Sequence, residues 1–307
     1  MNTAYVSCNQ KSITMNLNLR FLTGALFMLP VLMLAQSPVS GFMKTKGDGS
    51  ITASFSSEKY DEVFLVPQKV DGVPVFNEVK TTSYSLYAEY GISDNFNLVF
   101  NLPYIKSEGQ AIPETLENTG YENERKGLQD VSIYGKYRFA SKATPNGMID
   151  FIAAAGIETP LGDYRVDEAL QSIIAIGNRS TDITGLAIAS YKHNNGIFIT
   201  GQIGYSLRSN SVPNALLSEV KLGYAASKFY LEGYVANQLS DDSGVDILGE
   251  GFNGFFPATR VNYTRLGFNA YVPVCKSVGL SGGYSNYIEG RNLGDADGFN
   301  WGVTYSF

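Results

Sequence analysis

The sequence predicts an all-β protein: a transmembrane, antiparallel, up-and-down β-barrel of about twelve strands. Three observations predict it. Apolar and polar residues alternate along about twelve segments, aromatic residues stand at the ends of the apolar rows, and short turns alternate with long connections along the chain. Alternation is typical of strands whose two faces meet different surroundings. Turns of unequal length at the two ends are typical of outer-membrane barrels.

The composition narrows the class of protein. The chain has 307 residues, of which 44% are hydrophobic, 13% aromatic and 17% charged, with two Cys and one His. The aromatic content argues against disorder, and two Cys exclude a disulfide scaffold. A single apolar run argues against a helical membrane protein. The net charge of −6 gives no reason to expect nucleic acid as a partner. One His leaves little for His-dependent catalysis or a multi-His metal site.

Residues 1–36 are expected to be a signal peptide that is cleaved. Arg20 precedes an apolar run over 21–35, which ends in a small residue, and this order is typical of a secretory signal. The run is shorter than the about 20 residues that a membrane-spanning helix needs. It also contains Pro30, which disfavours a stable helix. A membrane anchor is the alternative interpretation. Met15 is a possible true start of the chain.

Residues 37–307 are expected to form one domain, the barrel. The final segment, 299–307, shows the alternation most clearly, because aromatic or apolar residues occupy every odd position and small or polar residues every even one. Twelve strands of about 10–11 residues leave room for turns and loops, and ten or fourteen strands are the alternatives. The expected strand centres are Ser54, Leu86, Phe100, Ser132, Ala153, Ile188, Ile203, Lys221, Glu232, Leu266, Ser281 and Val303.

The connections between these segments alternate in length. Asn195-Gly196 is a strong signal for a tight hairpin. The other short connections are expected near 93–94, 144–147, 227–228 and 274–276, and the long ones over 62–79, 107–127, 158–181, 209–215, 240–259 and 289–297. Short turns are expected on the periplasmic side and long loops outside the cell. Because an even strand number returns the chain to its starting side, both termini are expected in the periplasm.

Aromatic residues distinguish the barrel from a soluble β-sandwich, which would bury its apolar face. Outward rows are expected to carry Tyr90, Phe96, Phe139, Tyr224, Phe229, Tyr305 and Phe307 near the short turns, and Phe55 and Tyr104 near the long loops. Rings at both borders of an apolar band are what the two bilayer interfaces select. Outer-membrane lipid is therefore an expected partner. The terminal Phe307, preceded by aromatic residues at alternate positions, resembles the signal recognised by the barrel-assembly machinery.

Several stretches of the chain resemble a known family. Residues 85–104, 127–139 and 159–164, with the Gly-Asp-Gly lead at 47–49, are similar to the outer-membrane barrels named for the MetA pathway of phenol degradation. Gln129 stands where the family has the second Gly of its Gly-Leu-Gly-Asp strand. The resemblance covers nearly the whole mature chain. It implies a small outer-membrane barrel that acts as a channel or transporter for small, often hydrophobic molecules.

If the aromatic rows meet lipid, the alternate positions line the lumen. The charged candidates are Glu58, Glu89, Asp130, Lys136, Arg138, Asp150, Asp182, Arg208, Glu219, Lys221, Glu232 and Arg265, and the candidate tyrosines are Tyr87, Tyr134, Tyr230, Tyr234, Tyr263, Tyr271 and Tyr287. Nearly every strand charge falls on this face, as expected when an Arg or Lys facing lipid costs about 2–4 kcal/mol. These residues either form a structural network or contact a solute. Their mixed signs disfavour a channel for anionic sugars.

Two loops carry patterns of their own. Residues 163–176 have helical spacing, with Asp163 as a possible N-cap, and are expected either to enter the mouth or to pack on neighbouring loops. Asp241, Asp242 and Asp246, and Asp295 with Asp297, are either cation ligands or solvated acids, and solvated acids are favoured because no full calcium-loop spacing exists.

Three functional hypotheses follow. The first is a passive outer-membrane channel for small hydrophobic or aromatic molecules. The second is a structural or adhesive barrel with a closed lumen, which acts through its loops. The third, an enzyme, is disfavoured because the single His193 is expected beside a short turn, away from the mouth formed by the long loops. No catalytic residue, cofactor or metal is expected, and the solute is not identified.

Overall fold

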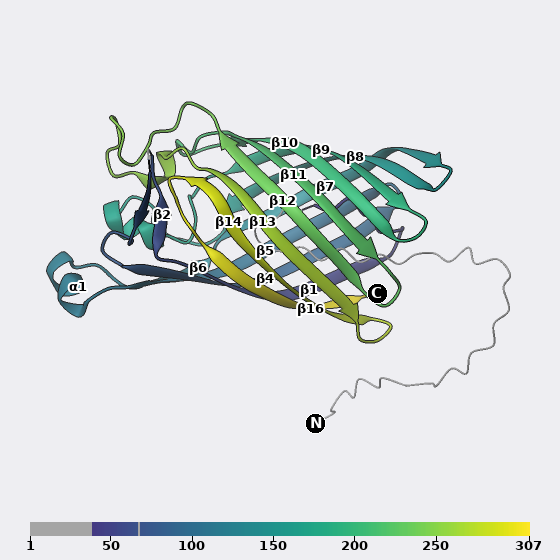
Figure 1. The fold of residues 1–307 in the computed structure, drawn as a ribbon, viewed down its shortest axis with the longest axis horizontal. Coiled ribbons are helices and arrows are strands. Elements are labelled where there is room, and N and C mark those ends of the chain that lie inside the picture. Colours follow the sequence, from purple (N-terminus) through teal and green to yellow (C-terminus); the bar gives the residue numbers. More distant parts are fainter. Residues whose placement is uncertain (1–38, 67) are drawn as a thin grey trace, which may run out of the picture.

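The computed structural model describes residues 39–66 and 68–307, and the signal peptide expected over 1–36 lies outside them. In the described chain, twelve antiparallel strands follow one another around a closed barrel (Figure 1). This confirms the predicted fold class and strand number. The barrel strands are β1 Gly49–Tyr60, β4 Glu78–Ser93, β5 Phe96–Gln110, β7 Asp130–Thr144, β8 Gly147–Pro160, β9 Asp182–His193, β10 Ile197–Arg208, β11 Ala215–Ala225, β12 Tyr230–Ser240, β13 Asn262–Pro273, β14 Val278–Arg291 and β16 Asp297–Ser306.

The barrel closes between its first and last strands. β1 pairs with β4 on one side and with β16 on the other, where Ser50 lies opposite Ser306 and Lys59 opposite Asp297. Closure leaves no strand edge in the ring, so the ladders satisfy the backbone groups within the wall. A short strand, β6 Glu124–Leu128, continues β7 along β5, and Gln129 forms the break between them. Each predicted strand centre falls within one barrel strand.

The apolar face of each strand points outward. In β12, Tyr230, Glu232 and Tyr234 are buried, whereas Leu231 and Val235 are exposed. A soluble protein would place the apolar set inside, so this inversion indicates that the outer surface meets lipid. The pattern follows directly from the period of two, because successive side chains of a strand point to opposite faces.

Aromatic rings gather toward both ends of the outer surface. Near the short turns, Phe307 stacks with Tyr90 and Tyr305, at ring-centroid distances of 6.4 Å and 6.0 Å. Toward the other end, Phe55 packs against Tyr84 and Trp301, with centroids 5.4 Å and 5.7 Å apart. Such rings are amphipathic and prefer the headgroup level of a bilayer, so the two groups mark the borders of the lipid-facing band.

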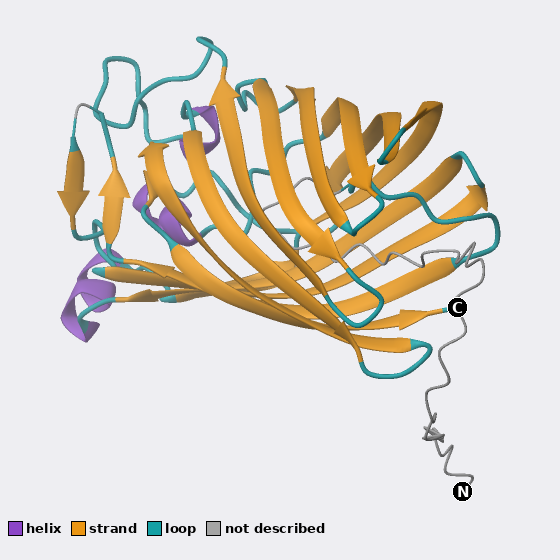
Figure 2. Ribbon diagram, turned by 45° about the vertical axis from the view of Figure 1, so that its right-hand side comes forward, coloured by secondary structure: helices purple, strands orange, loops and turns teal. Residues whose placement is uncertain are grey.

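The two ends of the barrel differ, and we call them the short-turn end and the long-loop end. The start of β1 and the C-terminus lie at the short-turn end (Figure 1). The additional elements gather at the long-loop end (Figure 2). These elements are α1 Pro113–Thr119, the three-stranded sheet of β2 Glu62–Phe64, β3 Lys69–Asp71 and β15 Leu293–Gly294, and the 3₁₀ helices η1 Ala169–Ile174 and η2 Phe256–Ala258. No helix in the described ranges is long and apolar enough to cross a bilayer.

The helix expected over 163–176 is only partly present. The structure has a six-residue 3₁₀ helix, η1, and its first residue, Ala169, has a left-handed φ of 49° that breaks any longer helix. Asp163 is exposed and pairs with Arg179 instead of capping a helix. Leu170 is exposed, so the expected apolar face is not buried as one stripe. The short helix α1 has clear terminal signals that sequence analysis did not use, Pro at its start and a left-handed Gly120 at its end.

We expect a charge placed on the outer face at mid-strand to destabilise the folded barrel. Val220 is the central residue of β11, is exposed, and lies opposite Gly201 and Val235. Val220→Arg should lower the free energy of unfolding in phospholipid vesicles by about 2–4 kcal/mol. Ser227→Arg, in a short turn, is the control and should cost about 0–1 kcal/mol. Equal costs for the two variants would contradict the assignment of the outer face to lipid.

Candidate functional site

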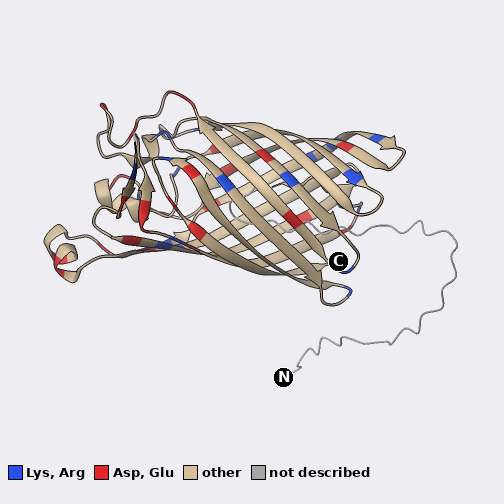
Figure 3. Ribbon diagram, viewed as in Figure 1, with Lys and Arg blue, Asp and Glu red and all other residues tan. Residues whose placement is uncertain are grey.

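The structure places the predicted lumen candidates on the inward-facing side of the barrel. Glu89, Asp130, Lys136, Asp150, Glu219, Lys221, Glu232, Arg265, Tyr87, Tyr134, Tyr230, Tyr234 and Tyr271 are buried, and Glu58, Arg138, Asp182, Arg208, Tyr263 and Tyr287 are partly buried. Figure 3 shows both signs of charge along the barrel strands. These side chains are thus buried or partly buried within the barrel, and their role in lining a solute path stays a prediction.

These charged side chains are joined by ion pairs and hydrogen bonds. Lys221 lies 2.9 Å from Glu219, and Arg208 lies 3.2 Å from Asp182. Arg265 binds both Glu58 and the hydroxyl of Ser285. A buried charge is tolerated when it is paired and hydrogen-bonded. The interior consequently has no strong excess of either sign along these strands.

One ion pair is fully enclosed. Lys136 on β7 and Glu89 on β4 both have side chains that are 0% exposed, and their charged atoms lie 2.6 Å apart. Asn97 on β5 donates a second hydrogen bond to Glu89 Oε1, at 2.8 Å. Lys136 Nζ also donates to the backbone carbonyls of Ser40 and Phe42. This lysine therefore links the barrel wall to a segment that precedes β1.

That segment, residues 39–48, fills the short-turn end of the lumen, and we call it the lumen segment. Val39, Ser40, Phe42 and Lys44 are buried although they belong to no strand. Val39 packs in a cluster with inward-facing side chains of β4, β5, β7, β8 and β9. Phe42 packs against a second cluster on β10 to β13. The segment thus contacts the wall on most sides of the barrel.

A tight turn connects the lumen segment to β1. Gly47 N donates to Gly91 O at 2.9 Å, and Gly91 N donates back to Asp48 O at 3.0 Å. A Cβ at Gly91 would lie 2.1 Å from the carbonyl oxygen of Thr45, so only glycine permits this approach. Lys46 N donates to Asp94 Oδ1 at 2.9 Å. The turn fixes one end of the segment at the rim of the short-turn end.

Loops cover the long-loop end of the lumen. Ile174 of η1 packs with Val73, Phe76 and Val79, and Tyr164 lies in a second cluster with Ile105 on β5. The η1 loop therefore packs on neighbouring loops and strands, which was one of the two expected outcomes for it.

The Tyr164 hydroxyl ties this covering loop to the wall. It donates a hydrogen bond to Asp130 and accepts one from Arg179 N at 3.0 Å. Burial, and then the bond to Asp130, raise the pKa of Tyr164, so the phenol remains a donor at neutral pH.

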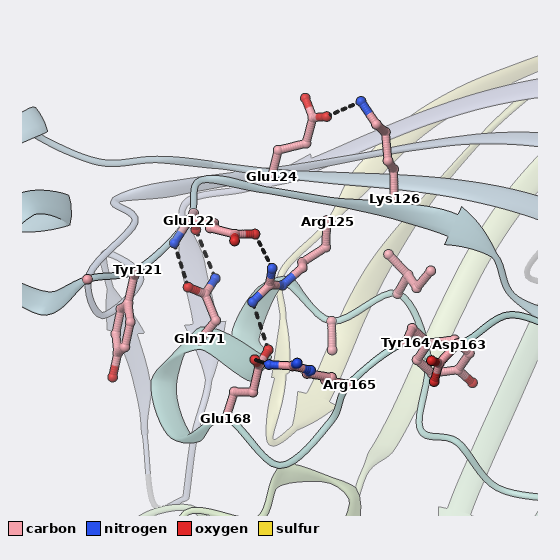
Figure 4. Close-up of a pocket in the computed structure, with 13 residues that line it drawn as sticks. Tyr121, Glu122, Glu124, Arg125, Lys126, Asp163, Tyr164, Arg165, Glu168 and Gln171 are labelled. Carbon is pink, nitrogen blue, oxygen red and sulfur yellow. Dashed lines mark hydrogen bonds and ion pairs between the residues drawn. The ribbon is translucent and has the colours of Figure 1, made fainter.

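A polar pocket of about 760 Å³ opens among these loops (Figure 4). Arg125 binds Glu122 and Glu168, and Arg165 also binds Glu168, at 3.2 Å. Gln171 exchanges two hydrogen bonds with the backbone of Glu122, which joins the η1 loop to the loop that carries α1. Because its charges are already paired with one another, the pocket is a candidate first contact for a polar solute and not a specific anion or cation site.

The acidic loop residues and His193 make contacts of their own among the described residues. The described chain contains no group of three or more His, Cys, Asp or Glu that could hold a metal ion. Asp246 binds Arg291, whose hydrogen bonds lower the pKa of that carboxyl group, and Asp295 binds Lys69. These contacts favour the interpretation of the loop acids as structural groups. His193 lies at the end of β9, where its Nδ1 accepts a hydrogen bond from Asn195 N at 3.1 Å.

Sequence reasoning missed the lumen segment. Its residues carry no alternation, and its partners on the wall lie far away in the sequence, as Lys136 does from Ser40. It also missed the pocket, because the charges that line it come from β6, from the loop before β6 and from the distant loop between β8 and β9. The Gly-Asp-Gly sequence at 47–49 leads into the barrel. Its glycines indicate a turn, which is where the chain reverses between the lumen segment and β1.

Comparison with known proteins decides the family. Residues 68–303 match the family described as "Putative MetA-pathway of phenol degradation". The chain belongs to this family. Membership confirms the resemblance carried by residues 85–104, 127–139 and 159–164. Comparison with curated proteins finds no match.

Comparison with solved structures supports the fold alone, and one of them matches it well. The COG4313 outer membrane channel from Pseudomonas putida F1 matches with a TM-score of 0.68 and 13% identity, over 88% of this chain and 99% of that chain. The translocator domain of the autotransporter NalP from Neisseria meningitidis matches with a TM-score of 0.47 and 14% identity, over 86% of this chain and 90% of that one. The CymD monoaromatic hydrocarbon channel gives 0.40 and 9%, over 86% and 88%. The chain thus has the fold of an outer-membrane β-barrel channel.

We expect the Lys136–Glu89 pair to be strongly coupled. Lys136→Met leaves Glu89 buried without its cation and should lower the free energy of unfolding by about 3–5 kcal/mol. The double variant Lys136→Met/Glu89→Leu should cost much less than the sum of the two single changes, because no unpaired charge remains. Urea unfolding of the four proteins in lipid vesicles measures this coupling. Additive costs would show that the two charges do not interact in the folded barrel.

Proposed function

We propose that this protein is a passive outer-membrane channel for small hydrophobic or aromatic molecules. The observation that carries the proposal is the lumen segment. Within the described chain, residues 39–44 are buried or partly buried in the short-turn end of the lumen, and the turn over 45–48 attaches them to β1. Movement of such a segment would clear the short-turn end of the lumen without disturbing the ladders of the wall. A barrel that served only as a scaffold would need no separable closing element.

The orientation of the proposed channel follows from the two ends. The short-turn end, with the C-terminal Phe307, faces the periplasm, and the long-loop end faces outward. Solutes would first meet the polar pocket beside η1 and then pass the tyrosine-rich interior. Phe307 would be recognised by the barrel-assembly machinery.

The inward tyrosines and the balanced charges support the solute class. Tyrosine offers an apolar face with a polar tip, which suits aromatic and amphipathic molecules. Candidates for direct contact are Tyr87, Tyr134, Tyr230 and Tyr271, which are buried beside the lumen segment. Strongly anionic sugars would find acids as well as bases along the same path.

A structural or adhesive barrel with a closed lumen is the second candidate function. It is favoured by the filling of both ends and by the enclosed Lys136–Glu89 pair. The two functions differ in one measurable property, because only a channel allows solutes to cross.

We expect cells that produce the protein to take up small aromatic solutes faster than cells that lack it. A series of small solutes, from glucose through benzoate and phenol to toluene, should show a gain that rises with hydrophobicity. Initial uptake rates of radiolabelled solutes measure it. The Val220→Arg barrel is expected in the membrane in lower amount. It therefore tests whether the uptake rate follows the amount of barrel. A barrel that raises uptake of none of these solutes would favour the structural function.

Locking the lumen segment should close the channel reversibly. A Cβ at Gly41 would lie 2.7 Å from Thr200 Oγ1, so a cysteine at position 41 faces the side chain of residue 200 at contact distance. In a Cys275→Ser background, the Gly41→Cys/Thr200→Cys barrel should conduct after reduction and lose most of its conductance after oxidation. Planar-bilayer recording in the presence and absence of reductant measures this.

The single variants Gly41→Cys and Thr200→Cys are the matched controls, and neither should respond to reductant. If the oxidised and reduced double variants conduct equally, then movement of the lumen segment does not open the barrel. If reduced protein and wild type both remain closed under every applied voltage, the passive-channel function itself is wrong.

A further inference from the structure

Phe42 of the lumen segment lies in a site built for one aromatic ring. Its side chain is 4% exposed and packs with Phe198, Ala225, Tyr230 and Tyr271. We call these four wall residues the ring cage. They come from four consecutive strands, β10, β11, β12 and β13, near the short-turn end. The ring cage therefore belongs to the wall, whereas its occupant belongs to a separable segment.

The geometry of the ring cage suits an aromatic ring. Phe198 lies edge-on to Phe42 at 5.0 Å between centroids with an interplanar angle of 80°, and Tyr230 does so at 6.1 Å and 75°. Edge-to-face contact of this kind is the preferred arrangement for aromatic pairs. The Lys192 ammonium lies 4.7 Å from the centroid of the Phe42 ring. A cation above a ring face is attracted to its negative quadrupole, an attraction that a saturated ring lacks.

The wall holds these groups in place without the lumen segment. Phe198 and Tyr230 stack on each other at 5.3 Å, and Tyr230 Oη donates to Glu232 Oε2 at 2.5 Å. Tyr230 lies directly opposite Tyr271 in the β12–β13 ladder. Lys192 Nζ donates to Asp150 Oδ2 at 2.9 Å, so its position is set by β8. A site formed on paired strands is preorganised for its ligand.

Two glycines in the wall leave the space that the ring cage occupies. A Cβ at Gly223 would lie 2.4 Å from Cζ of Phe198, and a Cβ at Gly279 would lie 2.0 Å from the hydroxyl of Tyr271. Neither the Phe198 ring nor the Tyr271 ring could hold its position if a larger residue replaced the glycine beside it. The wall is therefore shaped to present these rings to the lumen.

We propose that the ring cage is a binding subsite for benzyl-type solutes, and that Phe42 occupies it as a competing internal ligand while the lumen is closed. The Phe42 side chain is itself a benzyl group, so a free molecule of that class can make the same ring contacts. A solute and the lumen segment cannot occupy the ring cage together. Solute binding thus favours the state in which the segment has left. The assignment rests on the proposed channel function for its biological use, but the binding is measurable without transport.

The test measures binding of benzyl alcohol to the purified, folded barrel by ligand-observed NMR. Phe42→Ala should bind benzyl alcohol saturably and about five- to thirty-fold more tightly than wild type, because the internal competitor is gone. Met43→Ala is the matched control, since Met43 packs in the other cluster, and it should bind as wild type does. Adding Tyr271→Ala to Phe42→Ala should remove the gain.

Cyclohexylmethanol distinguishes an aromatic subsite from a simple apolar cavity. It has similar size and the same hydroxyl group but no π system, and Phe42→Ala should bind it several-fold more weakly than benzyl alcohol. Equal affinity for the two alcohols would overturn the proposal. Equal binding of benzyl alcohol to Phe42→Ala and Met43→Ala would overturn it as well.

A second measurement uses a full-length segment with its native Phe42. Benzyl alcohol should slow disulfide formation in the Gly41→Cys/Thr200→Cys barrel, because the solute displaces the segment from the wall, and cyclohexylmethanol should not. Unchanged oxidation rates would contradict competition. Conductance of the same preparations separates the two proposals: conduction without binding removes only the subsite, and binding without conduction removes only the channel function.

Discussion

Every backbone N–H and C=O group within a bilayer must find its partner inside the protein, and this constraint organises the whole molecule. Twelve strands meet it by closing into a ring through β1 and β16. Because the sheet is closed, alternate residues face either lipid or the lumen. The polar residues of each strand are therefore enclosed. Enclosed charges are tolerated only in pairs, and contacts such as Lys136 with Glu89 follow from that requirement.

The same ring sets how the lumen can be closed. Eight strands form a barrel narrow enough for side chains alone to fill, and twelve enclose more space. Here the lumen segment supplies the remainder. Val39 and Phe42 pack on inward-facing side chains of the wall, and Lys136 donates hydrogen bonds to the segment. The wall and its closure are thus held by different interactions. The lumen segment can therefore move while the hydrogen-bond ladders of the wall persist.

The wall could be predicted from the sequence because each strand carries its own evidence: the alternation over 299–307 needs no knowledge of any other strand. Position parity also predicted which charges face inward. Their partners could not be predicted, since Glu58 and Arg265 meet only after the barrel closes. The lumen segment left no local pattern, because its burial depends on distant residues. The spacing over 163–176 predicted a helix, and the left-handed backbone at Ala169 prevented it.

Attachment of the lumen segment to β1 couples its burial to the last step of barrel assembly. Val39 touches side chains of β4 and β5, on one side of the β1–β16 seam, whereas Phe42 touches β12 and β13, nearer the other side. A sheet that has not yet curled into a ring does not hold these two inward surfaces facing each other. The apolar burial of the segment is gained only when the ring forms, so it contributes free energy to closure rather than to any single hairpin. The segment that closes the finished lumen also makes formation of the seam more cooperative.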